Sequence, residues 1–281
     1  MSAGCRLRLG ACVIACNEER DLPRCLESLA FADERVVVVD ARSRDATLEI
    51  ARRSGARVFQ REYAGNIEQK RFALAQAESD WILSLDADEA VTPQLAREIR
   101  GVLAEPEPRV VGYELNRVTW HLGRWIRHGD FHPDWQLRLV RRGAGDWSGT
   151  NPHGRLRVTG PVRRLRGELE HHSYRDLADQ VDRIQDFSTA HSRSARPRAA
   201  AGAVRDLLLR PPARFLRAFV LKQGFRDGVP GLVIAGATAF HVFLKYAKEW
   251  ERIALGELPA GEGPRGKTAR SQPRGGLGHA P

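Results

Sequence analysis

Three apolar runs in the first ninety residues each end at polar side chains, and this pattern restricts the fold more than any other feature of the chain. The runs are Leu7–Ala15, followed by Asn17-Glu18; Val36–Val39, followed by Asp40; and Trp81–Leu85, followed by Asp86. Helical patterns separate them, at Asp21–Leu29, Asp45–Arg53 and Ile67–Ala77. Strands that alternate with helices form a parallel, doubly wound sheet, which binds ligands at the carboxyl ends of its strands. We therefore predict an α/β fold with a site at these strand ends.

The third strand end, Asp86-Ala87-Asp88, places two carboxylates one residue apart. Side chains at positions i and i+2 of a strand share a face, so both can reach one ligand if the strand geometry continues that far. Two like charges this close repel each other unless a cation lies between them. A hard divalent ion such as Mg²⁺ or Mn²⁺ takes oxygen ligands and is often shared with substrate phosphates. The alternative interpretation is a solvated acidic turn.

The other strand ends and one helix carry groups that suit a nucleotide. Asn17 and Glu18 offer an amide and a carboxylate to a base or ribose, and Asp40 can accept hydrogen bonds from either. Gln69 and Lys70 open a helix with donors for an anion or a base edge. Each residue also has a structural alternative, as a cap, a surface pair or a solvated helix face. Taken together, they predict a nucleotide-diphosphate site.

The chain is strongly basic, with 45 Lys and Arg against 35 Asp and Glu and a net charge of +10. Such an excess suits a polyanionic partner, which includes nucleic acid, an anionic membrane surface and phosphorylated substrates. The apolar segment Leu9–Cys16 is short and leads directly into Asn-Glu-Glu-Arg, so we expect no signal peptide. A reducing, cytoplasmic setting follows as the expectation.

Changes in amino-acid composition and in the predicted secondary structure divide the chain into four parts. We expect residues 1–108 to form the nucleotide-binding half of an α/β domain and residues 109–174, with strand-like pieces and several tryptophans, to form its acceptor half. Residues 175–255 read as a helical extension, with helices at Leu177–Ser194, Ala213–Phe225 and Leu232–Trp250. The Gly-, Pro- and Arg-rich residues 256–281 read as a disordered tail.

The helical extension combines positive charge with apolar stretches. Between Arg205 and Arg252 there are nine Lys or Arg against four Asp or Glu. The apolar stretch Val229–Leu244 is shorter than the roughly 20 residues that a spanning helix needs. We therefore expect this part to lie on a membrane surface, with its basic side chains at the lipid phosphates and its apolar face below. The alternative is an ordinary packing helix.

Four motifs in the first half share their order and spacing with a known family. They are Ala15-Cys16-Asn17-Glu18-Glu19, the stretch Val38-Val39-Asp40-Ala41-Arg42-Ser43-Arg44-Asp45-Ala46-Thr47, Glu68-Gln69-Lys70-Arg71 and Leu85-Asp86-Ala87-Asp88-Glu89. In these motifs the chain resembles family 2 glycosyltransferases of the GT-A fold. It is most similar to lipopolysaccharide-core β-glucosyltransferases, through motifs such as Gly123-Arg124-Trp125-Ile126-Arg127-His128-Gly129 and His171-His172-Ser173-Tyr174.

The resemblance implies a fold, a reaction and a location. The fold would be a GT-A-type, mostly parallel sheet with the C-terminal helices as a membrane-surface extension. The reaction would be an inverting transfer of a hexose, glucose from UDP-glucose, to a lipid-linked acceptor in lipopolysaccharide-core or other envelope polysaccharide assembly. Asp86 and Asp88 would hold Mg²⁺ or Mn²⁺, with His171 as a third ligand. The enzyme would be peripheral on the cytoplasmic face of the inner membrane.

The general base is where this chain departs from the family's pattern. Relatives often carry a His-Glu pair where this chain has His153-Gly154, so the glutamate is missing. Asp134 is the predicted base, since it precedes a strand and could point into the cleft, and His153 is the alternative. Arg42 replaces a glycine of the relatives and could alter the donor pocket.

Three competing interpretations remain at this point. A sugar nucleotidyltransferase would need a glycine-rich phosphate loop after the first strand, and the chain has none there. A basic nucleic-acid-binding protein would explain the charge, but the basic residues lie beside apolar stretches, so we expect a membrane and no nucleic acid. A non-catalytic relative would explain the missing glutamate.

Overall fold

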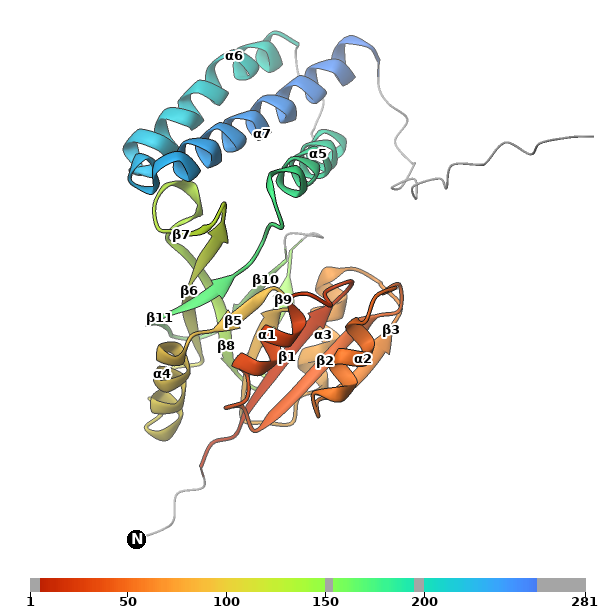
Figure 1. The fold of residues 1–281 in the computed structure, drawn as a ribbon, viewed down its shortest axis with the longest axis vertical. Coiled ribbons are helices and arrows are strands. Elements are labelled where there is room, and N and C mark those ends of the chain that lie inside the picture. Colours follow the sequence, from red (N-terminus) through yellow and green to blue (C-terminus); the bar gives the residue numbers. More distant parts are fainter. Residues whose placement is uncertain (1–5, 150–153, 195–199, 257–281) are drawn as a thin grey trace, which may run out of the picture.

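The computed structural model describes residues 6–149, 154–194 and 200–256, which form an α/β domain with three long helices to one side of it (Figure 1). The N-terminal half contains β1 (Leu9–Ala15), α1 (Leu22–Ser28), β2 (Glu34–Asp40), α2 (Thr47–Arg53), β3 (Arg57–Arg61), α3 (Asn66–Gln76), β4 (Trp81–Asp86), β5 (Glu89–Val91) and α4 (Pro93–Ala104). The second half contains β6 (Gly112–His121), β7 (Arg124–Ile126), the 3₁₀ turn η1 (Gly129–Phe131), β8 (Asp134–Arg141), β9 (Gly145–Ser148), β10 (Arg155–Val158) and β11 (Val162–His171). The C-terminal elements are α5 (Leu177–Ser194), α6 (Ala200–Leu216), the π-helical η2 (Arg217–Leu221), the 3₁₀ η3 (Gly224–Asp227) and α7 (Gly228–Ala254).

Nine strands form one sheet in the order β3-β2-β1-β4-β8-β6-β11-β5, with β7 paired to β6. The strands β3, β2, β1 and β4 are parallel, and β8 joins β4 antiparallel. The strands β6 and β11 are again parallel to each other, and β9 and β10 form a separate hairpin. The predicted α/β, doubly wound fold class is therefore confirmed, with its parallel half formed by the N-terminal strands.

The valine strand β2 shows why the sheet needs a layer on each face. All four valines, Val36–Val39, are almost completely buried. Val37 and Val39 join the core formed with α1, α2 and α4, whereas Val36 and Val38 join the core formed with α3. A strand covered on both faces needs a continuous apolar run rather than an alternating one, because both sets of side chains leave water. The carboxyl ends of β1, β2 and β4 thereby come to one edge.

The C-terminal helices differ from the predicted ones. The second helix was predicted to begin at Ala213, directly after Pro211-Pro212, but both prolines lie inside α6, which runs to Leu216 and continues as η2. The packing of α6 along α7 maintains the helix where proline removes backbone donors. The chain then turns at Gln223, whose φ is +57°, and α7 begins at Gly228 rather than at Leu232.

Two buried aspartates attach these helices to the α/β domain. Asp227, 1% exposed, accepts hydrogen bonds from the backbone nitrogens of Arg127 (3.1 Å) and His128 (2.8 Å). Asp130 of η1 lies 2.8 Å from Nε of Arg214 and 3.0 Å from Nζ of Lys222. Because a buried carboxylate needs such partners, these contacts fix the junction between the two parts.

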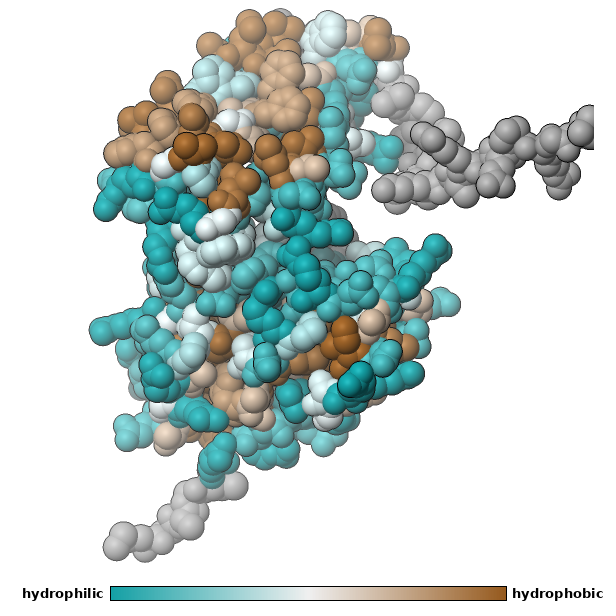
Figure 2. Space-filling view, viewed as in Figure 1, coloured by the Kyte–Doolittle hydropathy of each residue, from teal (hydrophilic) through white to brown (hydrophobic). Residues whose placement is uncertain are grey.

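The C-terminal helices expose a large apolar surface (Figure 2). Within the described residues, one helical stretch, Gly224–Ala254, is long and apolar enough to cross a membrane by length and composition. Only 22% of its most apolar window is buried in the protein. The exposed apolar side chains around the α6–α7 turn are Leu208, Leu209, Leu216, Val220, Leu221, Phe225, Val229 and Leu232. We call this set the apolar tip.

We predict that Gly167→Ala destabilises the protein by about 1–3 kcal/mol or more, because the added Cβ would lie 2.5 Å from Cα of Leu95 in α4. Gly101→Ala on α4 is the matched control, since its Cβ would meet nothing within 4 Å. The better helix propensity of alanine should raise stability there by about 0.5–1 kcal/mol. Urea unfolding followed by circular dichroism measures both values. Equal stability of the two variants would contradict the close packing of α4 on β11.

Candidate functional site

The end of β4 brings its two carboxylates into one pocket. The strand ends at Asp86, and a turn carries the chain to Asp88, so the predicted alternation does not continue to the second aspartate. Both residues nevertheless line the same pocket of about 310 Å³, which we call the donor pocket. It is also lined by Ile14, Ala15, Cys16, Glu18, Val38, Asp40, Tyr63, Asn66, Gln69, Ala87, His171 and Arg183.

Asp86 is held between two cations. Its Oδ1 lies 2.7 Å from Nζ of Lys70, and its Oδ2 lies 3.0 Å from Nη2 of Arg138. Burial by itself would raise the pKa of this carboxyl group, but the charges of Lys70 and Arg138 lower the pKa well below its ordinary value. Asp86 is therefore ionised, and its negative charge is already compensated by the protein.

Asp88 has a different partner, the last residue of β11. Nε2 of His171 lies 3.3 Å from Oδ2 of Asp88, and the backbone nitrogen of His172 donates to the backbone oxygen of Asp88 (2.9 Å). Burial opposes ionisation of Asp88, but the adjacent His171 outweighs it and lowers the pKa of the carboxyl group. A carboxylate oxygen and an imidazole nitrogen side by side are a donor set that suits Mn²⁺ or Mg²⁺.

The predicted three-residue metal set is not closed in this structure. Among the residues that the structure describes, no group of three or more His, Cys, Asp and Glu side chains is arranged to hold a metal ion. Both carboxylate oxygens of Asp86 form ion pairs, one with Lys70 and one with Arg138. The side chains of Asp88 and His171 are therefore the ones available to bind a metal ion. Water or substrate oxygens would have to supply the remaining ligands.

The far side of the donor pocket carries the predicted nucleotide-binding residues. Gln69 is buried, and its Oε1 has no hydrogen-bond partner among the described residues, so it can accept a hydrogen bond from a ligand. Asp40 also lines the pocket and pairs with Arg42 (2.6 Å), which lies over the ring of Tyr63 at 4.0 Å. Arg42 thus packs on Tyr63, which lines the donor pocket. The sequence interpretation did not identify Tyr63.

Asn17 and Glu18 have different roles in the structure. Oδ1 of Asn17 accepts from the backbone nitrogen of Arg44 (2.9 Å), so its amide fixes a neighbouring loop and lies outside the donor pocket. Glu18 lines the donor pocket, where burial and the negative charge of Asp88 raise its pKa to about 7. Arg183 of α5 lies near it and opposes this shift. The sequence offered no signal for Arg183, because it is one of many basic residues in the C-terminal helices.

Asp134, the predicted base, begins β8 and lies outside the donor pocket. Oδ2 of Asp134 is 2.7 Å from Nη2 of Arg117, and Oδ1 accepts from Nε2 of Gln136 (2.6 Å). Burial by itself would raise the pKa of Asp134, but the charge of Arg117 and the hydrogen bond from Gln136 lower it, with a further contribution from His171. His153, the alternative base, lies outside the described residues.

Arg117 connects Asp134 to the donor side. Its Nη1 lies 3.1 Å from Oε1 of Glu89, a fully buried carboxylate that also contacts Arg138 at 2.5 Å. Arg138 in turn contacts Asp86. The sequence signal for this network was Leu137-Arg138-Leu139, a single arginine between two leucines, which belongs to the motifs of the family resemblance but to which we assigned no role in the site. A chain of ion pairs thus joins the two halves of the site.

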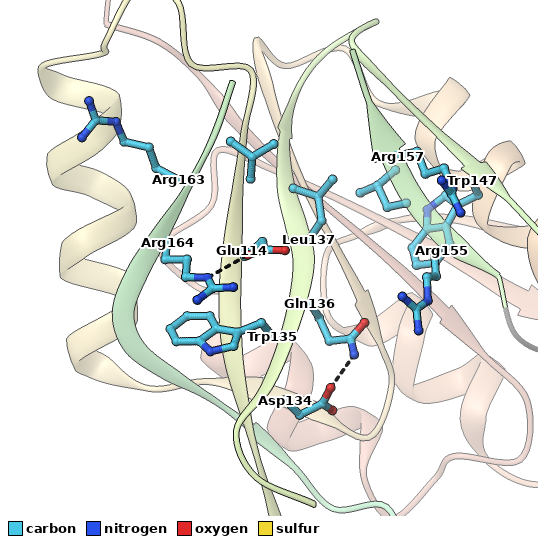
Figure 3. A pocket seen from close by; sticks show the side chains of 12 residues that line it. Glu114, Asp134, Trp135, Gln136, Leu137, Trp147, Arg155, Arg157, Arg163 and Arg164 are labelled. Carbon is cyan, nitrogen blue, oxygen red and sulfur yellow. Dashed lines mark hydrogen bonds and ion pairs between the residues drawn. The ribbon is translucent and has the colours of Figure 1, made fainter. Parts of the chain in front are cut away.

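A second cavity, of about 870 Å³, opens beside Asp134 (Figure 3). We call it the arginine groove, because Arg155, Arg157, Arg163 and Arg164 line it. Its other lining residues are Glu114, Asp134, Trp135, Gln136, Leu137, Trp147, Leu156 and Val162. The ion pairs of Arg117, Glu89 and Arg138 therefore connect Asp134 in the arginine groove to Asp86 in the donor pocket.

Comparisons with known proteins agree on one family. The family model described as glycosyl transferase family 2 matches residues 11–165. The lipopolysaccharide core biosynthesis glycosyltransferase LpsC of Rhizobium meliloti (strain 1021) is 30% identical over 261 residues, which cover 90% of this chain and 96% of LpsC. The uncharacterized glycosyltransferase RT0209 of Rickettsia typhi is 26% identical over 251 residues, which cover 86% of each chain.

Among solved structures, S. aureus TarS 1–349 in complex with UDP is similar, with a TM-score of 0.45 and 16% identity over 89% of this chain and 92% of that chain. Glucosyl-3-phosphoglycerate synthase from Mycobacterium tuberculosis, in complex with Mn²⁺, UDP and glucosyl-3-phosphoglycerate, is 24% identical over 42% of this chain and 45% of that chain, with a TM-score of 0.34. The residues that the family model matches include the ends of β1, β2 and β4 at the donor pocket, and the alignment with LpsC covers 90% of the chain. The chain therefore belongs to glycosyl transferase family 2 and is a glycosyltransferase.

Proposed function

We propose that this protein is an inverting, metal-dependent hexosyltransferase that transfers glucose from UDP-glucose to a lipid-linked acceptor in lipopolysaccharide-core or other envelope polysaccharide assembly. The observation that carries the proposal is the pairing of Asp88 with His171 beside an Asp86 whose charge is already compensated. Uncompensated negative charge is thereby concentrated at the position where a nucleotide sugar would place its diphosphate.

The donor pocket suits the nucleotide portion of such a substrate. The unpartnered Oε1 of Gln69 can accept the N–H of a pyrimidine, and Asp40 can accept hydrogen bonds from a ribose or a base. Tyr63 offers an aromatic face at the rim, beneath the guanidinium of Arg42. These residues support a nucleotide with a hydrogen-bond donor on its base, such as uridine.

The diphosphate leaves with additional negative charge, which requires compensation. Asp88 and His171 would hold Mg²⁺ or Mn²⁺, which supplies a Lewis acid for the leaving diphosphate. Arg183 lines the same pocket and adds positive charge from the protein. Arg138 and Lys70 keep Asp86 ionised and fixed, so that the pocket keeps its shape during the reaction.

An inverting transfer also needs a base on the side of the sugar opposite the diphosphate. Asp134 lies across the Glu89–Arg117 network from the donor pocket and is ionised at neutral pH, because Arg117 and Gln136 lower its pKa. Its ionised carboxylate can receive the proton of the acceptor hydroxyl group as that oxygen bonds to the sugar carbon and the bond from that carbon to the diphosphate breaks. Arg117 would hold the carboxylate in position during the transfer.

The helical extension supports a location on a membrane. The apolar tip is bordered by Arg210, Arg214, Arg217, Lys222 and Arg226, which suits an anionic lipid surface. The name of the relative LpsC, a lipopolysaccharide core biosynthesis glycosyltransferase, supports an acceptor in the envelope. We infer a peripheral enzyme on the cytoplasmic face of the inner membrane, with residues 1–108 for the donor, 109–174 for the acceptor and 175–255 for the membrane.

Replacing Asp88 should abolish metal-dependent turnover. We expect Asp88→Ala to lower Mn²⁺-dependent UDP release from UDP-glucose by at least about 100-fold, since the leaving diphosphate loses its metal. Glu49→Ala on the exposed surface of α2 is the control and should keep wild-type turnover. Full turnover by Asp88→Ala in the presence of acceptor would contradict the metal role.

Replacing Asp134 should affect chemistry rather than donor binding. We expect Asp134→Asn to lower kcat by about 10²–10⁴-fold and to leave KM for the UDP-sugar within a few-fold, because Asp134 lies outside the donor pocket. Asp146→Asn, an exposed carboxylate on β9, is the control. Transfer by Asp134→Asn at the wild-type rate would place the base elsewhere.

The apolar tip should carry membrane binding. We expect Leu221→Glu/Phe225→Glu, at positions 77% and 52% exposed, to lose more than about tenfold in vesicle affinity, because each apolar side chain contributes roughly 1.5–3 kcal/mol when it leaves water. Flotation with phosphatidylethanolamine–phosphatidylglycerol vesicles measures this affinity. Arg97→Gln/Arg100→Gln on α4 changes the net charge equally and should float like the wild type. Unchanged flotation of the tip variant would refute the membrane assignment.

A further inference from the structure

The arginine groove is built by strands of the second half of the α/β domain, β6, β8, β9, β10 and β11. Figure 3 shows Glu114 from β6, Asp134–Leu137 from β8 and Arg163 and Arg164 from β11 along one wall, with Arg155 and Arg157 from β10 across from them. Arg155 and Arg157 of the β9–β10 hairpin are exposed, so this wall of the groove is in contact with solvent. An exposed cavity lined by charged side chains is a surface on which a ligand can bind.

The groove carries positive charge that the protein does not compensate. Four arginines line it, against two carboxylates. Arg164 pairs with Glu114 (2.9 Å) and Arg163 pairs with Glu107 outside the groove (2.6 Å). Arg155 and Arg157 have no ion-pair partner among the described residues, and both are exposed. A guanidinium group binds a carboxylate or a phosphate with two parallel hydrogen bonds, so this pair suits an anionic group.

Aromatic and apolar side chains line the arginine groove together with the arginines. Trp135 is half-buried, with the guanidinium of Arg164 over its ring at 4.5 Å, and it offers the accessible aromatic surface, whereas Trp147 on the opposite wall is almost completely buried. Leu137, Leu156 and Val162 complete the lining. Flat apolar faces beside hydrogen-bond donors are the surfaces on which sugar rings rest, because a ring presents C–H groups on its face and hydroxyl groups at its edge. The lining therefore fits a charged saccharide better than a simple anion.

The groove ends at the proposed base. Asp134 lines it together with Gln136, which holds Oδ1 of Asp134 at 2.6 Å (Figure 3). On its other side, Asp134 is joined through Arg117 and Glu89 to the donor side of the site. A saccharide in the groove would thus present a hydroxyl group to the carboxylate that takes its proton.

We propose that the arginine groove binds the acceptor through an anionic sugar, one that carries a phosphate or a carboxylate close to the accepting hydroxyl group. The assignment of the groove to the acceptor rests on the function proposed above, whereas the binding of an anionic saccharide there stands without it. Arg155 and Arg157 bind the anionic group, Trp135 supports the ring, and the neutral remainder of the acceptor extends into solvent.

Binding by the purified full-length protein, without any donor, tests the proposal. Isothermal titration is performed with three oligosaccharide probes: tetragalacturonate for carboxylates, phosphorylated pentamannose for phosphates and maltotetraose as the neutral probe. We expect at least one anionic probe to bind about tenfold or more tighter than maltotetraose, and we expect Arg155→Gln/Arg157→Gln to lower that affinity about tenfold. The stronger of the two anionic probes identifies the charged group. Arg52→Gln/Arg53→Gln on α2 makes the same change in net charge on an exposed helix and should bind like the wild type.

Three outcomes would overturn the proposal. These are equal binding of charged and neutral probes, equal loss of affinity in the two double variants, and tighter binding of a single-stranded DNA decamer than of either anionic oligosaccharide. Circular dichroism of each variant confirms that it is folded. UDP release from UDP-glucose by the wild type is measured separately, so a failure of the transferase function is distinguishable from a failure of the groove.

Discussion

A buried carboxylate, Glu89, is the interaction on which the two halves of the site depend. It is fully buried and contacts Arg138 and Arg117, and its second oxygen accepts the backbone N–H of Asp86 (3.0 Å). Removing one member of such a network leaves a buried charge without a partner, which costs about 3–5 kcal/mol in proteins. Glu89 thus holds Asp86 through Arg138, and it holds the proposed base Asp134 through Arg117. A fixed spacing between donor and base is what an in-line displacement requires.

The ion pairs of this network also explain why Asp88 differs from the other carboxylates of the site. Asp86, Glu89 and Asp134 are balanced by Lys70, Arg138 and Arg117, which are all within ion-pair distance of them. Among the described residues, His171 is the one ion-pair partner of Asp88. The lowered pKa of Asp88 keeps it ionised, so negative charge remains beside the imidazole of His171. The C-terminal helices reach the same region through Arg183 of α5, which links the helical part of the chain to the donor pocket.

The sequence predicted those features that follow from burial and periodicity. The run Val36–Val39 requires cover on both faces, so the parallel sheet and the strand ends at Asp40 and Asp86 could be placed. Arg138 could not, because the register between β6 and β8 shifts between Tyr113 and Glu114, and a local count of alternating residues does not reveal such a shift. The predicted helix start at Ala213 is wrong, because α6 continues through Pro211-Pro212, and this continuity depends on packing against α7 rather than on local propensity. Asn17 lies in the predicted region, but its amide serves the backbone of Arg44.

The central claim is that Asp88 and His171 hold a divalent ion against the diphosphate of a UDP-sugar. The most direct measurement is a crystal structure of the protein with Mn²⁺ and UDP, with the metal located by anomalous scattering. The account predicts an anomalous peak within bonding distance of Asp88 and His171, with the uracil toward Gln69 and Asp40. A bound UDP without a metal peak at Asp88, or a metal held elsewhere in the chain, would contradict it.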